Sequence, residues 1–202
     1  ISWSIQNDGN SCSFVVSRYY KDIQNIVSPD WLQKKLLSIG LRPINALVDI
    51  TNFITMDLGR PLHVFDADKI GNKLNMRLSN DQEKLLALDN KEYSLNNTTT
   101  VIADSKNPLA IAGIIGGNDS GCTLETKNVF LEVAVFNPSM VAKTGRKLGI
   151  NSDARYRFER GLDLEMVNEG LDYATSLIQD ICGGSFSKKT HAGDLDLNKK
   201  II

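Results

Sequence analysis

The spacing of apolar residues gives its clearest helical signal near the C-terminal end of the sequence. Six apolar residues from Leu164 to Ile181 recur at alternating intervals of three and four positions, which places them on one face of a helix. Asp163 precedes this run as a capping residue, and Gly183-Gly184 follows it. We therefore predict a long helix that begins at an Asp163 cap and packs one apolar face on a core.

Three further segments carry helix start and stop signals. Ser28-Pro29-Asp30 combines a hydroxyl cap, an early proline and a first-turn acid, and Gly40 ends the segment. Asn137-Pro138-Ser139 repeats the cap and proline, with an end near Leu148-Gly149. Between them, residues 45–58 are predicted to be mostly helical, and the glycine and proline of the next stretch mark a turn.

Short extended segments fill the middle of the chain. They are rich in β-branched and apolar residues and are separated by polar turn clusters such as NDQE and DNKE. Helices and short strands without a linker or a repeat predict one intertwined α+β unit over residues 1–202. The predicted strands cover residues 11–17, 74–79, 84–89, 98–104 and 128–136, with an edge strand within 185–193.

Composition narrows the class of protein. The 202 residues are 42% hydrophobic, which is enough for a buried core, and the net charge is −1. A protein that coats nucleic acid is therefore excluded, although a local basic patch is compatible with these values. Since the chain begins at Ile1 without an initiator methionine, we interpret it as a fragment of a longer polypeptide.

The cysteines exclude two further classes. Cys12, Cys122 and Cys182 are few, odd in number and far apart, so neither a disulfide framework nor a zinc site is predicted. There is no signal peptide and no apolar run near the length of a membrane span. We expect a cytoplasmic protein with no membrane partner.

Five motifs in a fixed order carry the strongest signal. The motifs are RPINALVDITNF, GRPLHVFD, AIAGIIGG, FLEVAVFNP and KLGINSDARYRFERG. Together they resemble the B3/B4 region of the bacterial-type phenylalanyl-tRNA synthetase β subunit, whose fold is an intertwined α+β domain with mixed and antiparallel sheets of short strands. Each motif alone is weak, but five in register cover most of the chain.

The resemblance implies a proofreading role. The intact α2β2 enzyme of the family ligates phenylalanine to tRNA(Phe) with ATP and magnesium, whereas its B3/B4 region hydrolyses tRNA(Phe) that carries tyrosine by mistake. This implies that the fragment needs no cofactor or metal of its own. Its implied partners are the acceptor end of tRNA(Phe), the α subunit and the other β-subunit domains.

The resemblance assigns recognition of the tyrosyl hydroxyl to Glu132 and Gly116. Phenylalanine would leave a buried acceptor unpaired, at a cost of about 1–3 kcal/mol, and an ionised acceptor would discriminate more sharply. Glu132 interrupts an apolar strand, and the missing side chain of Gly116 lets a ligand approach the backbone. The alternatives are an exposed or Arg-paired Glu132, and a bulge or tight turn at Gly116.

His63, Pro61 and Asn52 are also implied pocket residues. A neutral imidazole at His63 would orient a water molecule or the terminal ribose, or accept a proton, and Asn52 would lie near it at the rim. On a helix, Asn52 shares one face with Asp49 and Met56. The alternatives are a core histidine and an amide that caps a helix or stabilises a turn.

Gly113, Ser152 and Ala154 match positions that line the pocket in the family. Many relatives carry threonine where this chain has Ser152, so the pocket here would be slightly roomier. Without a metal ligand set, hydrolysis would depend on a positioned water, on backbone donors and on the free hydroxyl of the terminal ribose. Neither a nucleophilic serine nor a catalytic triad is predicted.

Basic residues near the end of the chain have two interpretations. Lys143, Arg146 and Lys147 could contact tRNA phosphates or form ion pairs. For RFERG, at 157–161, ion pairing is the preferred interpretation. Two alternative functions stay open: a non-catalytic module that positions tRNA or scaffolds subunits, and the related domain of tRNA-modifying enzymes, which shares part of the fold but not this set of pocket residues.

Overall fold

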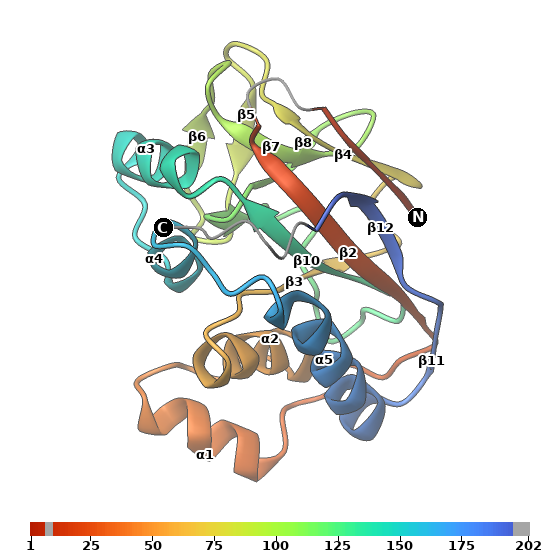
Figure 1. Cartoon of the computed structure of the whole chain (residues 1–202). Helices are drawn as coiled ribbons and strands as arrows, with labels where there is room; N and C mark the ends of the chain where they lie inside the picture. Colours follow the sequence, from red (N-terminus) through yellow and green to blue (C-terminus); the bar gives the residue numbers. More distant parts are fainter. Residues whose placement is uncertain (7–9, 196–202) are drawn as a thin grey trace.

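The computed structural model describes residues 1–6 and 10–195 and confirms the predicted α+β class (Figure 1). One sheet has the strand order β11-β2-β10-β3, with β12 also paired to β2. Its strands are antiparallel throughout. They are β2 (Cys12–Lys21), β3 (His63–Asp66), β10 (Val129–Phe136), β11 (Ser185–Phe186) and β12 (Thr190–Gly193).

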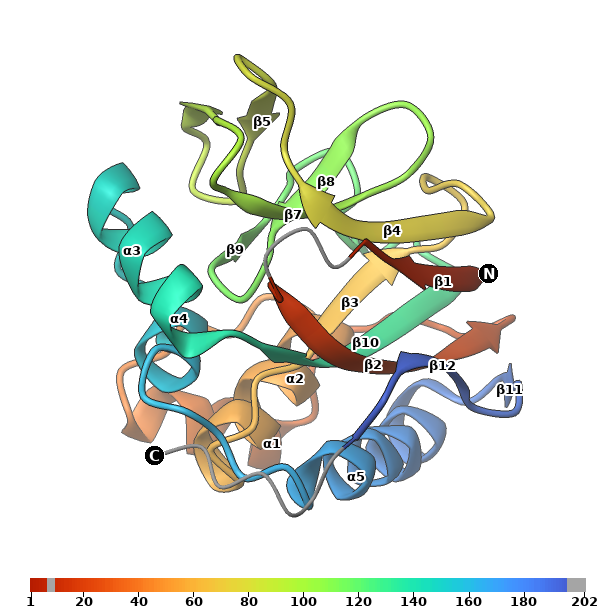
Figure 2. The same cartoon turned by 45° about the horizontal axis from the view of Figure 1, so that its top comes forward.

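A second sheet lies above the first in Figure 2, and its strand order is β1-β4-β7-β8-β9. Only the β1–β4 pairing is parallel, so this sheet is mixed. Its strands are β1 (Ser2–Ile5), β4 (Lys73–Leu78), β7 (Thr100–Ala103), β8 (Pro108–Ile111) and β9 (Ile115–Gly116). A separate hairpin consists of β5 (Lys84–Leu86) and β6 (Glu92–Ser94).

Helices cover the face of the first sheet that points away from the second sheet (Figure 1). Helices α2 and α5 pack together there, and α1 packs on the outer side of α2. Helices α3 and α4 lie together at one end of both sheets (Figure 2). The helices are α1 (Asp30–Ser38), α2 (Ala46–Asp57), α3 (Pro138–Leu148), α4 (Asp153–Phe158) and α5 (Met166–Cys182).

Strand β10 separates two hydrophobic cores because successive side chains point to opposite faces of a strand. Leu131 and Val133 belong to the core shared with α2 and α5. Phe130 and Ala134 belong to the core between the two sheets. All eight residues of β10 are buried, so any polar group on this strand is withdrawn from bulk water.

Asparagine caps and glycine ends confirm two of the predicted helix boundaries. The Asn45 side chain accepts from the Val48 N–H at the start of α2, and Asn137 accepts from Ser139 and Met140 at the start of α3. Gly149 ends α3 with φ of 67°, a left-handed conformation that favours glycine.

The predicted caps of α1 and α5 are wrong. Pro29 is the cap residue of α1, and the Ser28 hydroxyl instead donates to the buried Asp49 carboxylate. Helix α5 begins at Met166 after Glu165, because the Asp163 carboxylate accepts from the Glu165 N–H in a local turn. Short polar side chains form such turns as readily as caps, so the sequence pattern alone does not separate the two.

Some strand boundaries also differ from the predictions, and several short elements, among them β3, β6, β8 and β9, were not predicted individually. The strand predicted at 11–17 extends to Lys21, the one at 84–89 ends at Leu86, and 185–193 contains two short strands. β1 and the six-residue α4 were not predicted. Elements this short show too few repeats for a periodic pattern.

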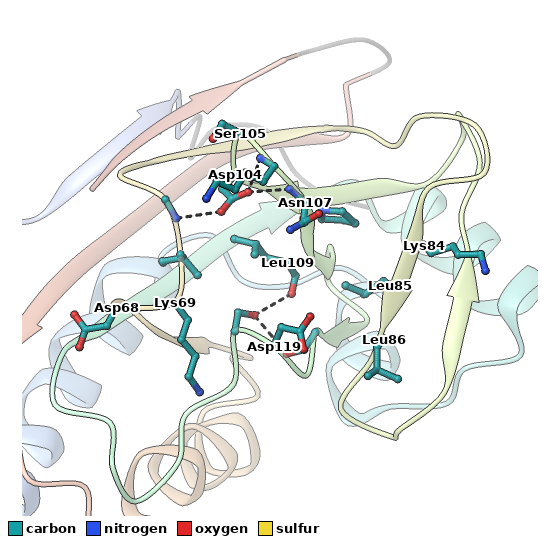
Figure 3. A pocket seen from close by; sticks show the side chains of 16 residues that line it. Asp68, Lys69, Lys84, Leu85, Leu86, Asp104, Ser105, Asn107, Leu109 and Asp119 are labelled. Atoms are coloured by element: carbon teal, nitrogen blue, oxygen red, sulfur yellow. Dashed lines mark hydrogen bonds between the residues drawn. The ribbon is translucent and has the colours of Figure 1, made fainter.

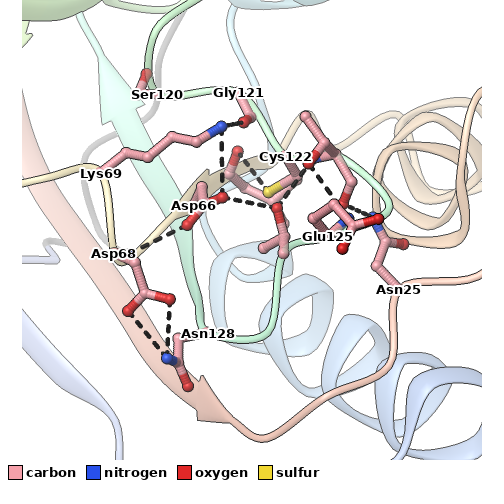
Figure 4. A network of polar contacts seen from close by, with 12 residues as sticks. Asn25, Asp66, Asp68, Lys69, Ser120, Gly121, Cys122, Glu125 and Asn128 are labelled. Atoms are coloured by element: carbon pink, nitrogen blue, oxygen red, sulfur yellow. Dashed lines mark hydrogen bonds and ion pairs between the residues drawn. The ribbon is translucent and has the colours of Figure 1, made fainter.

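A polar network anchors one end of β3 (Figure 4). Asp66 is 5% exposed, and its carboxylate accepts from the Thr126 hydroxyl at 2.7 Å and from the Asp68 N–H at 3.2 Å. The Lys69 ammonium lies 3.5 Å from the same carboxylate and donates to the Gly121 carbonyl. These contacts tie the loop before β10 to the end of β3 and so fix the pairing of the two strands.

Candidate functional site

The pairing of β3 with β10 places Glu132 directly opposite His63. Side chains of such a pair share one face of the sheet, with Cβ atoms about 5 Å apart. That face points toward the second sheet, because Phe65 and Phe130, the next pair on the same face, lie in the core between the sheets. Two titratable side chains from distant parts of the sequence therefore meet in the interior.

Gly116 of β9 approaches the same point from the second sheet. A Cβ added there would lie 2.5 Å from His63 Cε1 and 3.0 Å from both His63 Nε2 and Leu88 Cδ1. The imidazole thus lies directly against the Gly116 backbone, and a side chain at this position would displace it. The structure brings together His63, Glu132 and Gly116, three of the residues named from sequence.

The His63 side chain is partly buried and has unused hydrogen-bonding capacity. It packs edge-on against Phe65 with the ring centres 4.4 Å apart, and Nε2 is buried without a partner among the described residues. Burial lowers the pKa of His63 to about 4, because it disfavours the charged form. At neutral pH the imidazole is therefore uncharged, with one nitrogen able to accept and the other to donate.

Glu132 is 4% exposed, which excludes the alternative that it lies on the solvent face of its strand. Burial raises the pKa of Glu132 to about 8, and the nearby Arg60 partly opposes this rise. The protonated carboxyl predominates at pH 7, and the ionised acceptor becomes the major form only above about pH 8. Glu132 is the one acid on β10. Because it is withdrawn from water, its pKa responds strongly to a nearby charge.

Arg60, which was not predicted from sequence, approaches Glu132 from the turn before β3. Its side chain is buried, and Nη2 donates to the Ala134 carbonyl at 2.8 Å. That bond continues the β3–β10 pairing beyond His63, where β3 has no further backbone donor. Pro61 is buried between Arg60 and the strand. An arginine between Gly59 and Pro61 produces no periodic signal, so its burial could not be predicted from a local pattern.

The Ser152 hydroxyl links α4 to the turn that carries Gly113 and Gly116. It caps α4 and donates to the Ile114 carbonyl at 2.6 Å. Gly113 has φ of 69°, and a Cβ there would lie 2.9 Å from Phe136, so this glycine packs on the aromatic core away from the imidazole. Ala154 is half-buried against the same core. Ser152 therefore supports the β9 turn through Ile114, and the expected place of these three residues in the pocket wall stays a prediction.

Asn52 lies in the middle of α2 and is half-buried. It does not cap the helix, since Asn45 has that role, and its side chain makes no hydrogen bond to a residue of the described ranges 1–6 and 10–195. Helix α2 packs against β3. Its expected position at the rim beside His63 stays a prediction. Asp49, expected on the same face, is a buried structural acid that accepts from Ser28 and the Ile44 N–H.

The basic residues divide into two groups. In RFERG, Arg157 pairs with Asp153 at 3.1 Å and Arg160 with Glu159 at 3.0 Å, which confirms the ion-pairing interpretation. Lys143, Arg146 and Lys147 are exposed on α3 and form no ion pair within the described part of the chain.

A cavity of about 490 Å³ opens elsewhere on the molecule, between the turn at 67–71, the loop at 104–108 and β5 (Figure 3). Its lining includes Asp104, whose carboxylate accepts from three backbone N–H groups, and Lys69, which belongs to the Asp66 network. None of the predicted site residues lines it. The cavity and the predicted site residues therefore lie in different parts of the fold.

The described residues contain neither a metal-binding cluster nor a membrane-spanning helix. No cluster of three or more histidine, cysteine, aspartate or glutamate side chains there could hold a metal ion. Of the described helices, none has both the length and the apolar character needed to cross a membrane.

Comparison with known proteins places the chain in a family. The B3/4 domain family matches residues 11–183. A phenylalanine–tRNA ligase beta subunit from Brucella suis biovar 1 (strain 1330) is 53% identical over 180 residues, which is 89% of this chain and 22% of that protein. One from Rhodopseudomonas palustris is 50% identical over 195 residues, or 96% and 24%. The chain thus spans about a quarter of the length of these relatives.

A solved structure shows the same fold. It is an N-terminal fragment of the phenylalanyl-tRNA synthetase beta subunit from Pyrococcus horikoshii, with a TM-score of 0.61 and 16% identity over 96% of this chain and 54% of that one. At this identity the likeness concerns the fold alone. The match over residues 11–183 shows that the chain belongs to the B3/4 domain family, and the beta subunits of phenylalanine–tRNA ligases are similar to it in sequence.

Proposed function

We propose that this chain is an editing domain that hydrolyses the ester bond of tRNA(Phe) mischarged with tyrosine. The observation that carries the proposal is the buried meeting of His63, Glu132 and Gly116 from three separate strands. Structural residues in such a place have their hydrogen-bonding groups satisfied, whereas here His63 Nε2 has no partner among the described residues. Unused polar capacity in the interior favours a bound ligand.

Selection for tyrosine follows from the acceptor at Glu132. The phenolic hydroxyl would donate to this carboxylate, and a phenylalanyl group would leave the buried oxygen unpaired, at a cost of about 1–3 kcal/mol. The backbone of Gly116 forms the adjoining wall, because only glycine leaves room beside the imidazole. Added hydroxyls are difficult to reject in an apolar synthetic pocket, so a second site that requires the hydroxyl is useful.

His63 and Asn52 would assist hydrolysis by orienting the reacting groups. The neutral imidazole of His63 can accept a proton from water or from the terminal ribose, and Asn52 would support the same ribose from the rim. An aminoacyl ester is already reactive, so a positioned water and backbone donors are sufficient. The exposed Lys143, Arg146 and Lys147 would contact acceptor-end phosphates. ATP and magnesium would serve the synthetic reaction in other parts of the ligase.

The test uses the full-length ligase that contains this chain, assembled with its α subunit. Tyr-tRNA(Phe) is added, and deacylation is followed for the parent enzyme and for Glu132→Ala and His63→Ala, with circular dichroism as the control for folding. Loss of deacylation in both variants with an intact fold supports the proposal. A parent enzyme that fails to deacylate, or variants that match the parent rate, would overturn it.

One observation favours the alternative of a scaffolding module. Several large apolar side chains are exposed on α1 and in the segments that flank it, among them Val27, Trp31 and Ile44. Such a surface is typical of contacts with other domains. The same deacylation assay separates the two functions, because a pure scaffold would lose nothing on Glu132→Ala.

A further inference from the structure

Arg60 is a buried cation whose place in the fold is tightly defined. The side chain is 1% exposed, and its stem packs on α5, where a Cβ added to Gly170 would lie 3.2 Å from Arg60 Cγ. Nη2 donates to the carbonyl of Ala134. Ala134 lies two residues beyond Glu132 on the same face of β10. The guanidinium is therefore anchored two residues from Glu132 on the same strand, without a direct ion pair to its carboxyl.

Most of the Arg60 guanidinium has no partner. Nε and Nη1 are both buried without a hydrogen bond to a described residue. A guanidinium has five N–H donors, and burying them unpaired is expensive unless a counter-charge or a ligand compensates. The described carboxylates that act on Arg60 are those of Glu132 and Asp163, of which Glu132 has the larger effect. Since Asp163 is exposed, Glu132 is the buried carboxyl whose charge acts on Arg60, with no direct hydrogen bond or ion pair between the two side chains.

We propose that Arg60 is a specificity-determining positioning residue: its buried guanidinium favours the ionised form of Glu132, the form that accepts a strong hydrogen bond from the phenolic hydroxyl. The inference rests on the proposed editing function. Arg60 itself need not touch the substrate. It acts through Glu132, by stabilising the form of the carboxyl that accepts a strong hydrogen bond.

The other titratable groups around Glu132 do not supply this charge. His63 on β3 is neutral above about pH 4, since burial lowers the pKa of its imidazole. Cys12 on β2 stays a neutral thiol, because burial and the Glu132 carboxylate raise the pKa of Cys12 to about 12. Among the described residues, the charge that opposes the effect of burial on the Glu132 pKa is Arg60.

Removal of the cation is therefore expected to shift a pH profile. In the parent enzyme, selectivity for Tyr-tRNA(Phe) over Phe-tRNA(Phe) should rise as the pH passes through about 8, where Glu132 ionises. Without Arg60, the pKa of Glu132 is higher, so the rise moves to higher pH. A shift of one pH unit lowers the ionised fraction about tenfold on the acidic side of the midpoint.

The experiment compares neutral and charged replacements in the assembled full-length ligase. Arg60→Gln keeps a donor for the Ala134 carbonyl but loses the charge, and Arg60→Lys keeps the charge but loses the planar fork. For each variant, kcat/KM for Tyr-tRNA(Phe) and Phe-tRNA(Phe) is measured across the neutral to alkaline range and corrected for uncatalysed ester hydrolysis. The expected result is about tenfold lower selectivity at pH 7.5 for Arg60→Gln, with recovery at higher pH and in Arg60→Lys.

Two outcomes distinguish a failure of the role proposed for Arg60 from a failure of the proposed editing function. If the parent enzyme does not deacylate Tyr-tRNA(Phe), the proposed function fails. If the parent deacylates and Glu132→Gln loses selectivity, but Arg60→Gln keeps the parental midpoint, the function stands and the role of Arg60 is refuted. Should Arg60→Gln fail to fold, an unchanged selectivity midpoint in a folded Arg60→Met variant refutes it equally.

Discussion

The two ends of the short β3–β10 strand pair each carry a buried acid, and they differ in the hydrogen-bond donors that surround it. At one end, Asp66 accepts from a hydroxyl and a backbone N–H and has an ammonium beside it (Figure 4). At the other end, Glu132 pairs across the strands with His63, whose Nε2 has no partner among the described residues, and the nearby Arg60 uses only part of its donor capacity within that same part of the chain. The two acids are almost equally hidden, at 5% and 4% exposure.

The contrast shows that burial alone does not identify a functional acid. A buried acid with donors around it stabilises the fold, and one without them retains capacity for a ligand. The position of the cavity does not identify the end with the unsatisfied groups either. The cavity of about 490 Å³ adjoins the Asp66 end, with Asp68, Lys69 and Ser120 in its lining, whereas the unsatisfied groups lie at the Glu132 end.

The largest expected effect is at Gly116. Gly116→Ala places a methyl group 2.5 Å from His63 Cε1, so the imidazole must move. We expect deacylation of Tyr-tRNA(Phe) to fall about 10²-fold, the cost typical of a catalytic group displaced by 1 Å.

Gly121→Ala is the matched control. Its Cβ would press on the Asn118 carbonyl at 3.1 Å and would not approach the imidazole. Equal losses in the two variants would show that general strain on this turn, and not displacement of His63, limits the reaction.

Replacement of Asp66 should affect stability and not selectivity. Asp66→Asn removes the acceptor for the Thr126 hydroxyl and the charge near Lys69. We expect the free energy of unfolding to fall by about 1–3 kcal/mol, measured by urea denaturation, with an unchanged preference for Tyr-tRNA(Phe). A change in that preference would contradict the separation of the two ends. Asp68→Asn, at an exposed neighbour, should cost less.

The pH dependence of stability should carry the signature of Glu132. Its pKa in the folded chain is about 8, well above the ordinary value of 4.5, so the folded state binds the additional proton between these values. Stability therefore falls as the pH rises through this window, by at most about 1.4 kcal/mol per pH unit. His63 has the opposite effect below its ordinary pKa of 6.5.

The measurement is urea unfolding between pH 6.5 and 8, where the effect of His63 has ended. Glu132→Gln should remove the decline, and Glu92→Gln, at an exposed acid paired with Lys84, should leave it in place. A decline that persists in Glu132→Gln would mean that another group binds the proton.

The smallest effect is expected in the cavity of Figure 3. Lys106→Ala and Asp119→Ala change exposed lining residues that make no ion pair within the described ranges. Deacylation rates and selectivity should match those of the parent enzyme. A loss as large as that of Gly116→Ala would show that the site extends into this cavity.

Local patterns in the sequence were sufficient for much of the fold. The cap and proline at the start of α3 and the apolar face of α5 each depend on residues within a few positions of one another. Predictions failed where two local structures compete for one side chain, as at Ser28 and Asp163. They also failed for β1 and α4, whose few residues cannot show a period.

For the site, the sequence by itself determined which chemical groups are present: one acid within an apolar strand, a histidine after a turn, and a pair of glycines. Only the tertiary structure decided which of them meet, because the register of β3 on β10 pairs residues 63 and 132 across a long stretch of chain. It also decided their charge. The pKa of Glu132 is set by the water excluded around it and by Arg60, and neither desolvation nor a contact between distant segments is encoded in any local pattern.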